Sequence, residues 1–317
     1  PVAAIVFAVE IFSLDLVFTS LVPLLLASIA AVITSYFFRG TDVLFSFELL
    51  DVWRVKDIIF YVFLGLATGI ASVYFSKMYF LITRFFGWFS NAYVKIGIAA
   101  LAIGLMLYLF PPLYGEGYGL INNLLNGNTE VALSGIQYQI DFNNVWTVIA
   151  ILLLIAVFKA IAMTTTFAAG GVGGIFIPTL FMGSALGNSV AKVINQFGFE
   201  VSESNFTLIG MTGLMAGVLH APLTAIFLIA EITGGYDLFV PLMLVATISF
   251  GFTKYFVPNS IYTAELAKRG ELITKDKDKN ALMMLNIDRI IETDFIKIST
   301  EMTLGELLRK GVSRSSR

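Results

Sequence analysis

The sequence predicts an all-α protein that crosses a membrane several times. Hydrophobic residues make up 57% of the chain, charged residues make up only 13%, and the mean hydropathy is +0.85. Long runs without a charged residue recur, and many approach the roughly 20 residues that a membrane-spanning helix needs. Such runs include residues 16–38, 58–76, 96–115, 142–158, 204–230 and 238–253.

The first element belongs to an internal repeat. Residues 1–11 align without gaps with residues 222–232, and five of the eleven positions are identical, including the starting proline and the later glutamate. A turn containing Asp15 or Asp237 follows each copy, and then a long apolar helix containing Val-Pro-Leu. The alternative is a chance similarity between apolar segments. Paired segments in two halves are typical of a transporter built from structural repeats, with its site between them.

The repeated segments are too short to span a membrane. Residues 222–233 would make about 18 Å of helix, whereas the hydrocarbon core is roughly 30 Å thick. We therefore expect partial helices whose ends lie within the membrane.

A second interruption lies in the middle of residues 160–191, which carry no charge. Four glycines at positions 170, 171, 173 and 174 precede Pro178, a residue suited to the first turn of a new helix. The N–H groups of Ile175 and Phe176 would then lack partners, and such a helix start favours an anion. The alternatives are a glycine hinge or a close-packing face of small residues.

The distribution of charge predicts the orientation in the membrane, and the residue content excludes some kinds of chemistry. Eleven of the 20 Lys and Arg residues follow Pro258, so the positive-inside rule predicts a cytoplasmic C-terminus. The chain has no cysteine, which excludes disulfides and thiol chemistry. Its single histidine, His220, cannot form a histidine-based metal site, and we expect it to pack or to bond a loop. Lys159 is expected to snorkel from the end of an apolar run. We expect no metal, no cofactor and no nucleic-acid partner.

These segments resemble a known family. Residues 174–178, Gly-Ile-Phe-Ile-Pro, are similar to the G-x-F-x-P element of the CLC chloride channels and chloride/proton exchangers. Other segments are also similar to the family's motifs, and they occur in the family's order. They are residues 1–11, 115–119, 210–217, 221–224, 230–233 and 260–262. The resemblance implies an all-α polytopic membrane protein with an inverted-repeat CLC-type bundle of full, partial and broken helices.

The resemblance also implies a ligand and its site. The transported ligand would be chloride, and the anion-binding residues would be Gly174, Ile175, Phe176 and Tyr262. Gly173 and Pro178 would shape the start of the helix. Without the order of the family's motifs, Tyr262 would be interpreted as an aromatic residue at the membrane interface. In the family's pattern, a serine-bearing anion loop and the gating glutamate come before the position aligned with Pro1, so we expect these elements to precede Pro1 in the full protein.

The mechanism has two candidate forms within this family. Exchangers usually carry a proton-passing glutamate at the position aligned with Ile11, and isoleucine cannot titrate. This favours an anion channel over a chloride/proton antiporter. Glu10 and Glu231 are candidates for a proton pathway or for a hydrogen-bonded packing role beside the helix ends. A distant third hypothesis is an intramembrane hydrolase, with Ser184 as nucleophile and His220 as base.

Three regions and a homodimer complete the expected organisation. Residues 1–268 would form the CLC transmembrane domain without its N-terminal helices, and residues 269–287 a charged cytoplasmic linker. Residues 288–317 resemble the start of a CBS domain, with a strand at 294–298 and a capping box from Thr303 to Glu306. A complete CBS domain would be a candidate nucleotide site. The family's homodimer would place segments 1–38 and 222–254 at the interface, within the lipid bilayer.

Overall fold

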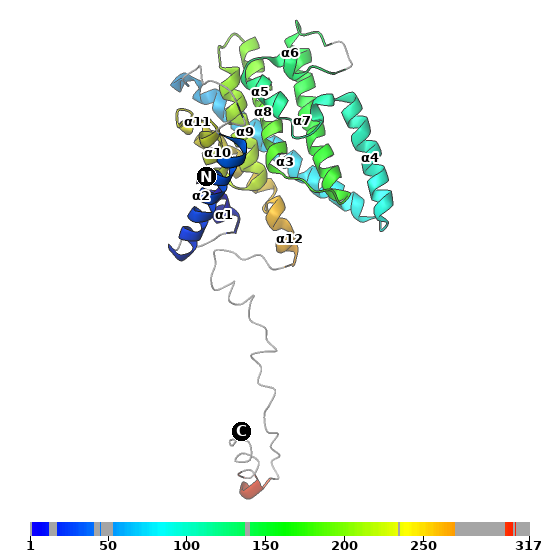
Figure 1. Ribbon diagram of the computed structural model, residues 1–317, viewed down its shortest axis with the longest axis vertical. Helices are drawn as coiled ribbons and strands as arrows, with labels where there is room; N and C mark the ends of the chain where they lie inside the picture. Colours follow the sequence, from blue (N-terminus) through cyan, green and yellow to red (C-terminus); the bar gives the residue numbers. More distant parts are fainter. Residues whose placement is uncertain are drawn as a thin grey trace. The chain divides into compact units, whose positions relative to one another are not determined.

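The computed structural model describes residues 2–12, 18–40, 45, 53–136, 140–233, 235–269, 302–306 and 308, and every regular element among them is helical (Figure 1). In chain order these are α1 (Val2–Phe12), α2 (Phe18–Arg39), η1 (Val55–Asp57), α3 (Ile58–Gly87), α4 (Ala92–Leu109), η2 (Pro111–Leu113), α5 (Tyr118–Leu125), α6 (Thr129–Ala132), α7 (Val145–Ala168), α8 (Phe176–Gln196), α9 (Glu203–Leu219), α10 (Pro222–Thr233), α11 (Phe239–Phe256) and α12 (Ile261–Arg269). The predicted all-α class is confirmed.

Among the described residues, five helical segments are long and apolar enough to cross a membrane. They are Leu21–Phe38, Val55–Gly87, Ala92–Leu109, Val145–Ala168 and Phe239–Ala264. Residues 204–230, which look like one apolar run in the sequence, instead form α9 and α10. His220 adopts a left-handed conformation between them (φ 57°), and Pro222 opens the next helix. The chain is therefore an integral membrane protein with partial helices.

Helix α9 lies at the centre of the bundle, and all of its residues from 205 to 219 are buried. Glycines let its neighbours approach closely. A Cβ atom on Gly210 would lie 2.5 Å from the carbonyl oxygen of Gly183 and 2.8 Å from the Cα of Gly187, both on α8. This close approach of two backbones is how small residues hold membrane helices together. On the side facing α3, the Ser72 hydroxyl donates to the carbonyl of Leu214 (3.2 Å).

The two copies of the repeat, α1 and α10, pack against each other and cap each other. The carboxylate of Glu10, near the end of α1, accepts hydrogen bonds from the N–H groups of Leu223 (2.9 Å) and Thr224 (2.8 Å) at the start of α10. The carboxylate of Glu231, near the end of α10, accepts hydrogen bonds from the N–H groups of Val2 and Ala3 at the start of α1. The helices are therefore antiparallel, as an inverted repeat requires.

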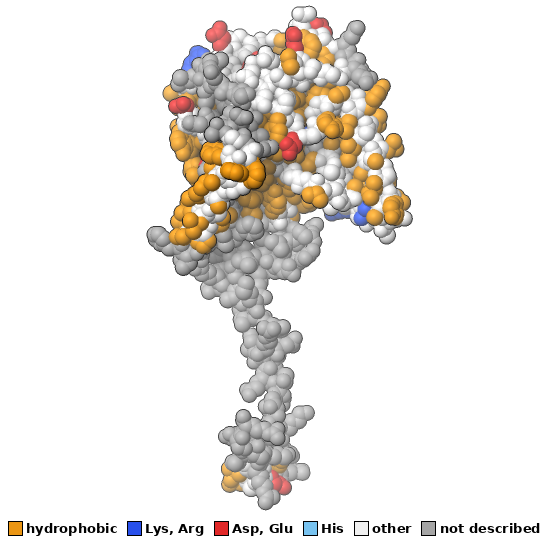
Figure 2. Space-filling model, viewed as in Figure 1, with side chains coloured by type: hydrophobic (Ala, Val, Ile, Leu, Met, Phe, Trp, Pro, Cys, Tyr) orange, Lys and Arg blue, Asp and Glu red, His pale blue; other side chains and the backbone are white. Residues whose placement is uncertain are grey.

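Apolar side chains dominate the outer surface. Figure 2 shows them gathered over α2 and α4, with acidic side chains toward the end of the bundle formed by α5 and α6. Within the apolar segment of α2 no residue is buried, and Leu26 and Ile33 are each 63% exposed. Such a surface suits lipid or another protein subunit.

Residues 1–268 form one compact unit, and residues 269–317 form a second. In the second unit a short helical turn covers residues 304–306. The carboxylate of Glu306 accepts a hydrogen bond from the Thr303 N–H (3.1 Å), which is one half of the predicted capping box. The predicted strand at 294–298 and most of the predicted linker lie outside the described residues.

Candidate functional site

The glycine-rich loop between α7 and α8 has a defined geometry. Helix α7 ends when the N–H of Gly170 donates to the carbonyl of Phe167 (3.0 Å) and that of Gly171 to the carbonyl of Thr166 (2.9 Å). Gly170 adopts φ 96°, a left-handed conformation that commonly ends helices. A Cβ on Gly171 would lie 2.8 Å from the Thr166 carbonyl oxygen, so this position also needs glycine. The chain then runs without regular structure until α8 begins at Phe176.

The start of α8 presents a series of unpaired backbone donors. Within the described part of the chain, the N–H groups of residues 172–177 make no hydrogen bond, and Ile175 caps the helix without a side-chain acceptor. The first paired N–H after the loop belongs to Thr179, which donates to Ile175 (3.1 Å). The sequence predicted this for Ile175 and Phe176, and the structure extends it to six residues. Unpaired donors at a helix start concentrate positive potential.

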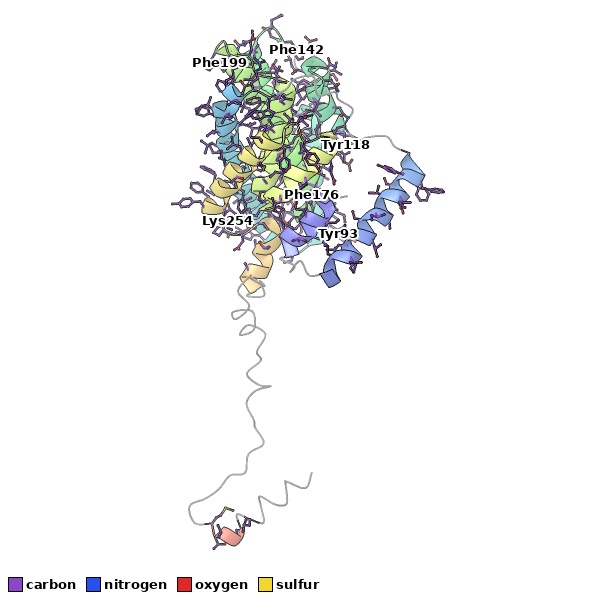
Figure 3. The ribbon with its side chains drawn as sticks, turned by 90° about the vertical axis from the view of Figure 1, so that its left-hand side faces the viewer. Tyr93, Tyr118, Phe142, Phe176, Phe199 and Lys254 are labelled. Carbon is purple, nitrogen blue, oxygen red and sulfur yellow. The ribbon has the colours of Figure 1, made fainter. Side chains whose placement is uncertain are left out.

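Three aromatic rings from distant segments meet beside this helix start. The ring of Phe7 on α1 lies edge-on to Phe176 (centroids 4.8 Å apart) and to Tyr262 (6.2 Å), the second residue of α12. Figure 3 shows Phe176 beside α1. Tyr262 is 37% exposed. Phe7 was not singled out in the sequence. In the sequence, the only feature that marks Phe7 is its position in the repeat, where the second copy has Leu228.

The glycines that flank the helix start leave it open. Gly173 and Gly174 are both exposed, and a Cβ on Gly174 would meet no atom within 4 Å. Pro178 falls in the first turn of α8, as predicted. Gly173, Gly174, Ile177 and Pro178 all line one cavity of about 480 Å³, whose other walls come from α4, α7 and the loop before α5.

The structure gives Glu10 and Glu231 hydrogen-bonding partners at helix starts. Besides its two backbone partners, Glu10 accepts a hydrogen bond from the Thr224 hydroxyl (2.6 Å). These contacts are those expected of the packing role beside the helix ends. The proton-pathway role of either residue stays a prediction.

One expectation from the sequence was wrong. Lys159 does not snorkel, because its side chain is only 4% exposed. Its Nζ instead donates to the carbonyl oxygens of Leu113 (3.1 Å) and Gly115 (2.8 Å) and lies 4.5 Å from the centre of the Phe181 ring. A loop that folds back over α7 supplies partners that the local sequence does not reveal.

Ser184 and His220 show no catalytic arrangement. The Ser184 hydroxyl is fully buried and donates to the carbonyl of Phe181 (2.8 Å). The His220 ring packs edge-on against Phe250 with centroids 5.8 Å apart, in line with the expected packing role. Among the described residues, no group of His, Cys, Asp and Glu side chains has the arrangement of a metal site.

Known proteins match this chain over most of its length. The family model described as voltage gated chloride channel matches residues 1–254. A putative chloride channel protein, ClcB-like, from Ralstonia nicotianae is 28% identical over 274 residues, which cover 84% of this chain and 59% of the relative. The voltage-gated ClC-type chloride channel ClcB of Salmonella typhimurium is 25% identical over 278 residues, which cover 84% and 61%.

Solved structures share the fold. A slow cyanobacterial Cl⁻/H⁺ antiporter has a TM-score of 0.69 at 21% identity, covering 85% of this chain and 60% of that one. A CLC-type fluoride/proton antiporter has a TM-score of 0.63 at 23% identity, covering 83% and 60%. The chain thus spans about 60% of the length of these relatives. CLC proteins are transporters rather than enzymes, so the hydrolase hypothesis is abandoned. The family match over residues 1–254, together with the shared fold, shows that the chain belongs to the voltage-gated chloride channel family.

Proposed function

We propose that the protein moves chloride, or a similar small anion, across a membrane. The observation that carries this proposal is the row of unpaired N–H groups at residues 172–177, at the start of a 21-residue helix in a chain of this family. Chloride is large and weakly hydrated, and a transported ion must bind without being trapped. Backbone and hydroxyl dipoles suit that task better than direct contact with a cationic side chain.

We assign the anion to the N–H groups of Ile175 and Phe176 and to the Tyr262 hydroxyl. Gly174 lets the anion approach the backbone. The ring of Phe7 contacts both aromatic rings of this arrangement and so links α1 to α8 and α12. Phe7 therefore connects α1, the first copy of the repeat, to the proposed site. Transporters built from repeats have their sites between the two halves.

The leading mechanism is a channel. Ile11 is partly buried against the apolar core and carries no titratable group, so it cannot relay protons from the cytoplasm. The second candidate is a chloride/proton antiporter, because the proteins of similar fold are described as Cl⁻/H⁺ and F⁻/H⁺ antiporters.

Reconstitution in liposomes distinguishes the two mechanisms. We expect the intact protein to dissipate a chloride gradient without pumping protons, since a buried proton path needs groups that titrate. The measurement is the internal pH while only a chloride gradient drives flux. Sustained uphill proton movement that a protonophore collapses would favour the antiporter. Absence of any anion flux would contradict the proposed function. The Ile11→Glu variant is the matched test for restored coupling.

We also propose that the protein is a homodimer in the bilayer, with its C-terminus in the cytoplasm. The exposed apolar surface of α2 and the outward positions of α10 and α11 support this interface, which is the one expected for the family. Leu223 is 53% and Val240 is 47% exposed despite their apolar side chains.

Single cysteines test the interface, because the native chain has none. We expect Leu26→Cys, Ile33→Cys, Leu223→Cys or Val240→Cys to crosslink between subunits in membranes. The control is Leu101→Cys on α4, which is also apolar and 77% exposed. Crosslinking at Leu101 with none at the other four positions would contradict the proposed interface.

A further inference from the structure

Lys159 is a buried cation with no assigned role. Among the residues whose burial the structure describes, it is the only buried Lys or Arg. It lies within α7, a helix long and apolar enough to cross the membrane. Ionisable groups at such positions are costly, and they commonly mark transport pathways.

The direct contacts of Lys159 attract an ammonium group and offset part of the cost of burying it. Two carbonyl oxygens and the face of the Phe181 ring are all electron-rich, and each attracts an ammonium group. The same partners occupy the side chain, so it cannot swing freely toward a passing ion. The charge is therefore fixed in place and acts through its field.

Lys159 lies beside the start of α8, across a cavity from the glycines that precede it. Lys159 lines the cavity of about 480 Å³ together with Gly174 and Ile177, which flank Ile175 and Phe176 directly. Phe181 lies five residues after Phe176, or about 7.5 Å along α8. Glu116, an exposed residue that interacts electrostatically with Lys159, lines the same cavity with the opposite charge.

We propose that Lys159 is a positioning residue that sets the electrostatic potential of the anion site, with Glu116 opposing it. This inference rests on the proposed function. Lys159 attracts anions toward the start of α8 without ligating them, because its donors serve the Leu113 and Gly115 carbonyls. In general, a unit charge about 10 Å from an anion, acting through an effective dielectric constant near 20, changes anion affinity roughly tenfold. The dipolar ligands hold the ion, and the distant charge sets how strongly.

The test measures bromide binding to the intact protein in detergent by titration calorimetry, and locates the ion by anomalous diffraction. Lys159→Met is expected to raise the bromide Kd about tenfold, and Lys159→Arg to leave it within about threefold. Glu116→Gln is expected to lower the Kd several-fold. The matched control is Lys192→Met, which removes a cation from the far end of α8, where it pairs with Glu203 (2.7 Å). Its bromide Kd is expected to stay unchanged.

The outcomes separate this inference from the proposed function. If the unmodified protein binds no bromide at Ile175 and Phe176, the proposed site is wrong. If it binds bromide and Lys159→Met leaves the Kd unchanged, Lys159 only holds the loop and the inference is overturned. Should Lys159→Met fail to fold, Lys159→Gln decides, because its neutral amide can still donate to the loop carbonyls without a charge. A purely structural role predicts an unchanged Kd for that variant.

Discussion

Replacing Gly210 with valine is expected to abolish the folded protein. The added carbon atoms would occupy space held by backbone atoms of Gly183 and Gly187, and backbone cannot rotate away as a side chain can. Helices α8 and α9 would have to separate, which moves the start of α8 as well. Overpacking against backbone is expected to cost about 4 kcal/mol or more, a large part of the stability of a typical domain.

Thermal unfolding in detergent and the yield of monodisperse protein measure this effect. The matched control is Gly104→Ala on α4, because a Cβ there meets no atom within 4 Å. That variant should be as stable as the unmodified protein or slightly more stable, since alanine favours helix over glycine. A Gly210→Val protein with an unchanged melting temperature would refute the close contact of α8 with α9.

Glu10→Ala is expected to destabilise the protein by roughly 2–4 kcal/mol. The change removes the acceptor for two backbone N–H groups and for the Thr224 hydroxyl, and it leaves the start of α10 uncapped. Glu10→Gln retains one amide oxygen as acceptor but loses the negative charge beside a helix start. It should therefore show an intermediate loss.

The melting temperatures of Glu10→Ala and Glu10→Gln test the predicted order of stability. Proton flux in liposomes tests the alternative, in which Glu10 belongs to a proton pathway. If Glu10→Ala melts like the unmodified protein but changes proton movement, Glu10 belongs to a proton pathway and not to the cap. Glu231→Ala provides the symmetric comparison, since Glu231 accepts hydrogen bonds at the start of α1.

Local signals in the sequence predicted much of this architecture. The proline and glutamate of each repeat copy predicted two short helices, and α10 has the predicted bounds, Pro222–Thr233. The glycines before Pro178 predicted the break between α7 and α8. Both predictions succeeded because glycine and proline act on the backbone where they stand, whatever surrounds them.

The contacts between distant segments could not be predicted in this way. Phe7 and Tyr262 are 255 positions apart, and nothing near either residue indicates that their rings meet. Lys159 was misjudged for the same reason, because its acceptors lie 44 and 46 residues earlier in the chain. Hydrophobic periodicity shows that a residue is buried or exposed, but not which loop folds over it.

The mutual capping of α1 and α10 has a consequence for biosynthesis. The partner of α1 lies 229 residues downstream, so α1 leaves the ribosome long before Glu231 exists. At about 5–20 residues per second, that interval is roughly 10–45 seconds. During this time the start of α1 has no acceptor from its repeat partner, although the helix is too short to span the bilayer. The nascent chain must therefore hold α1 in a provisional place until translation of α10 completes the pair.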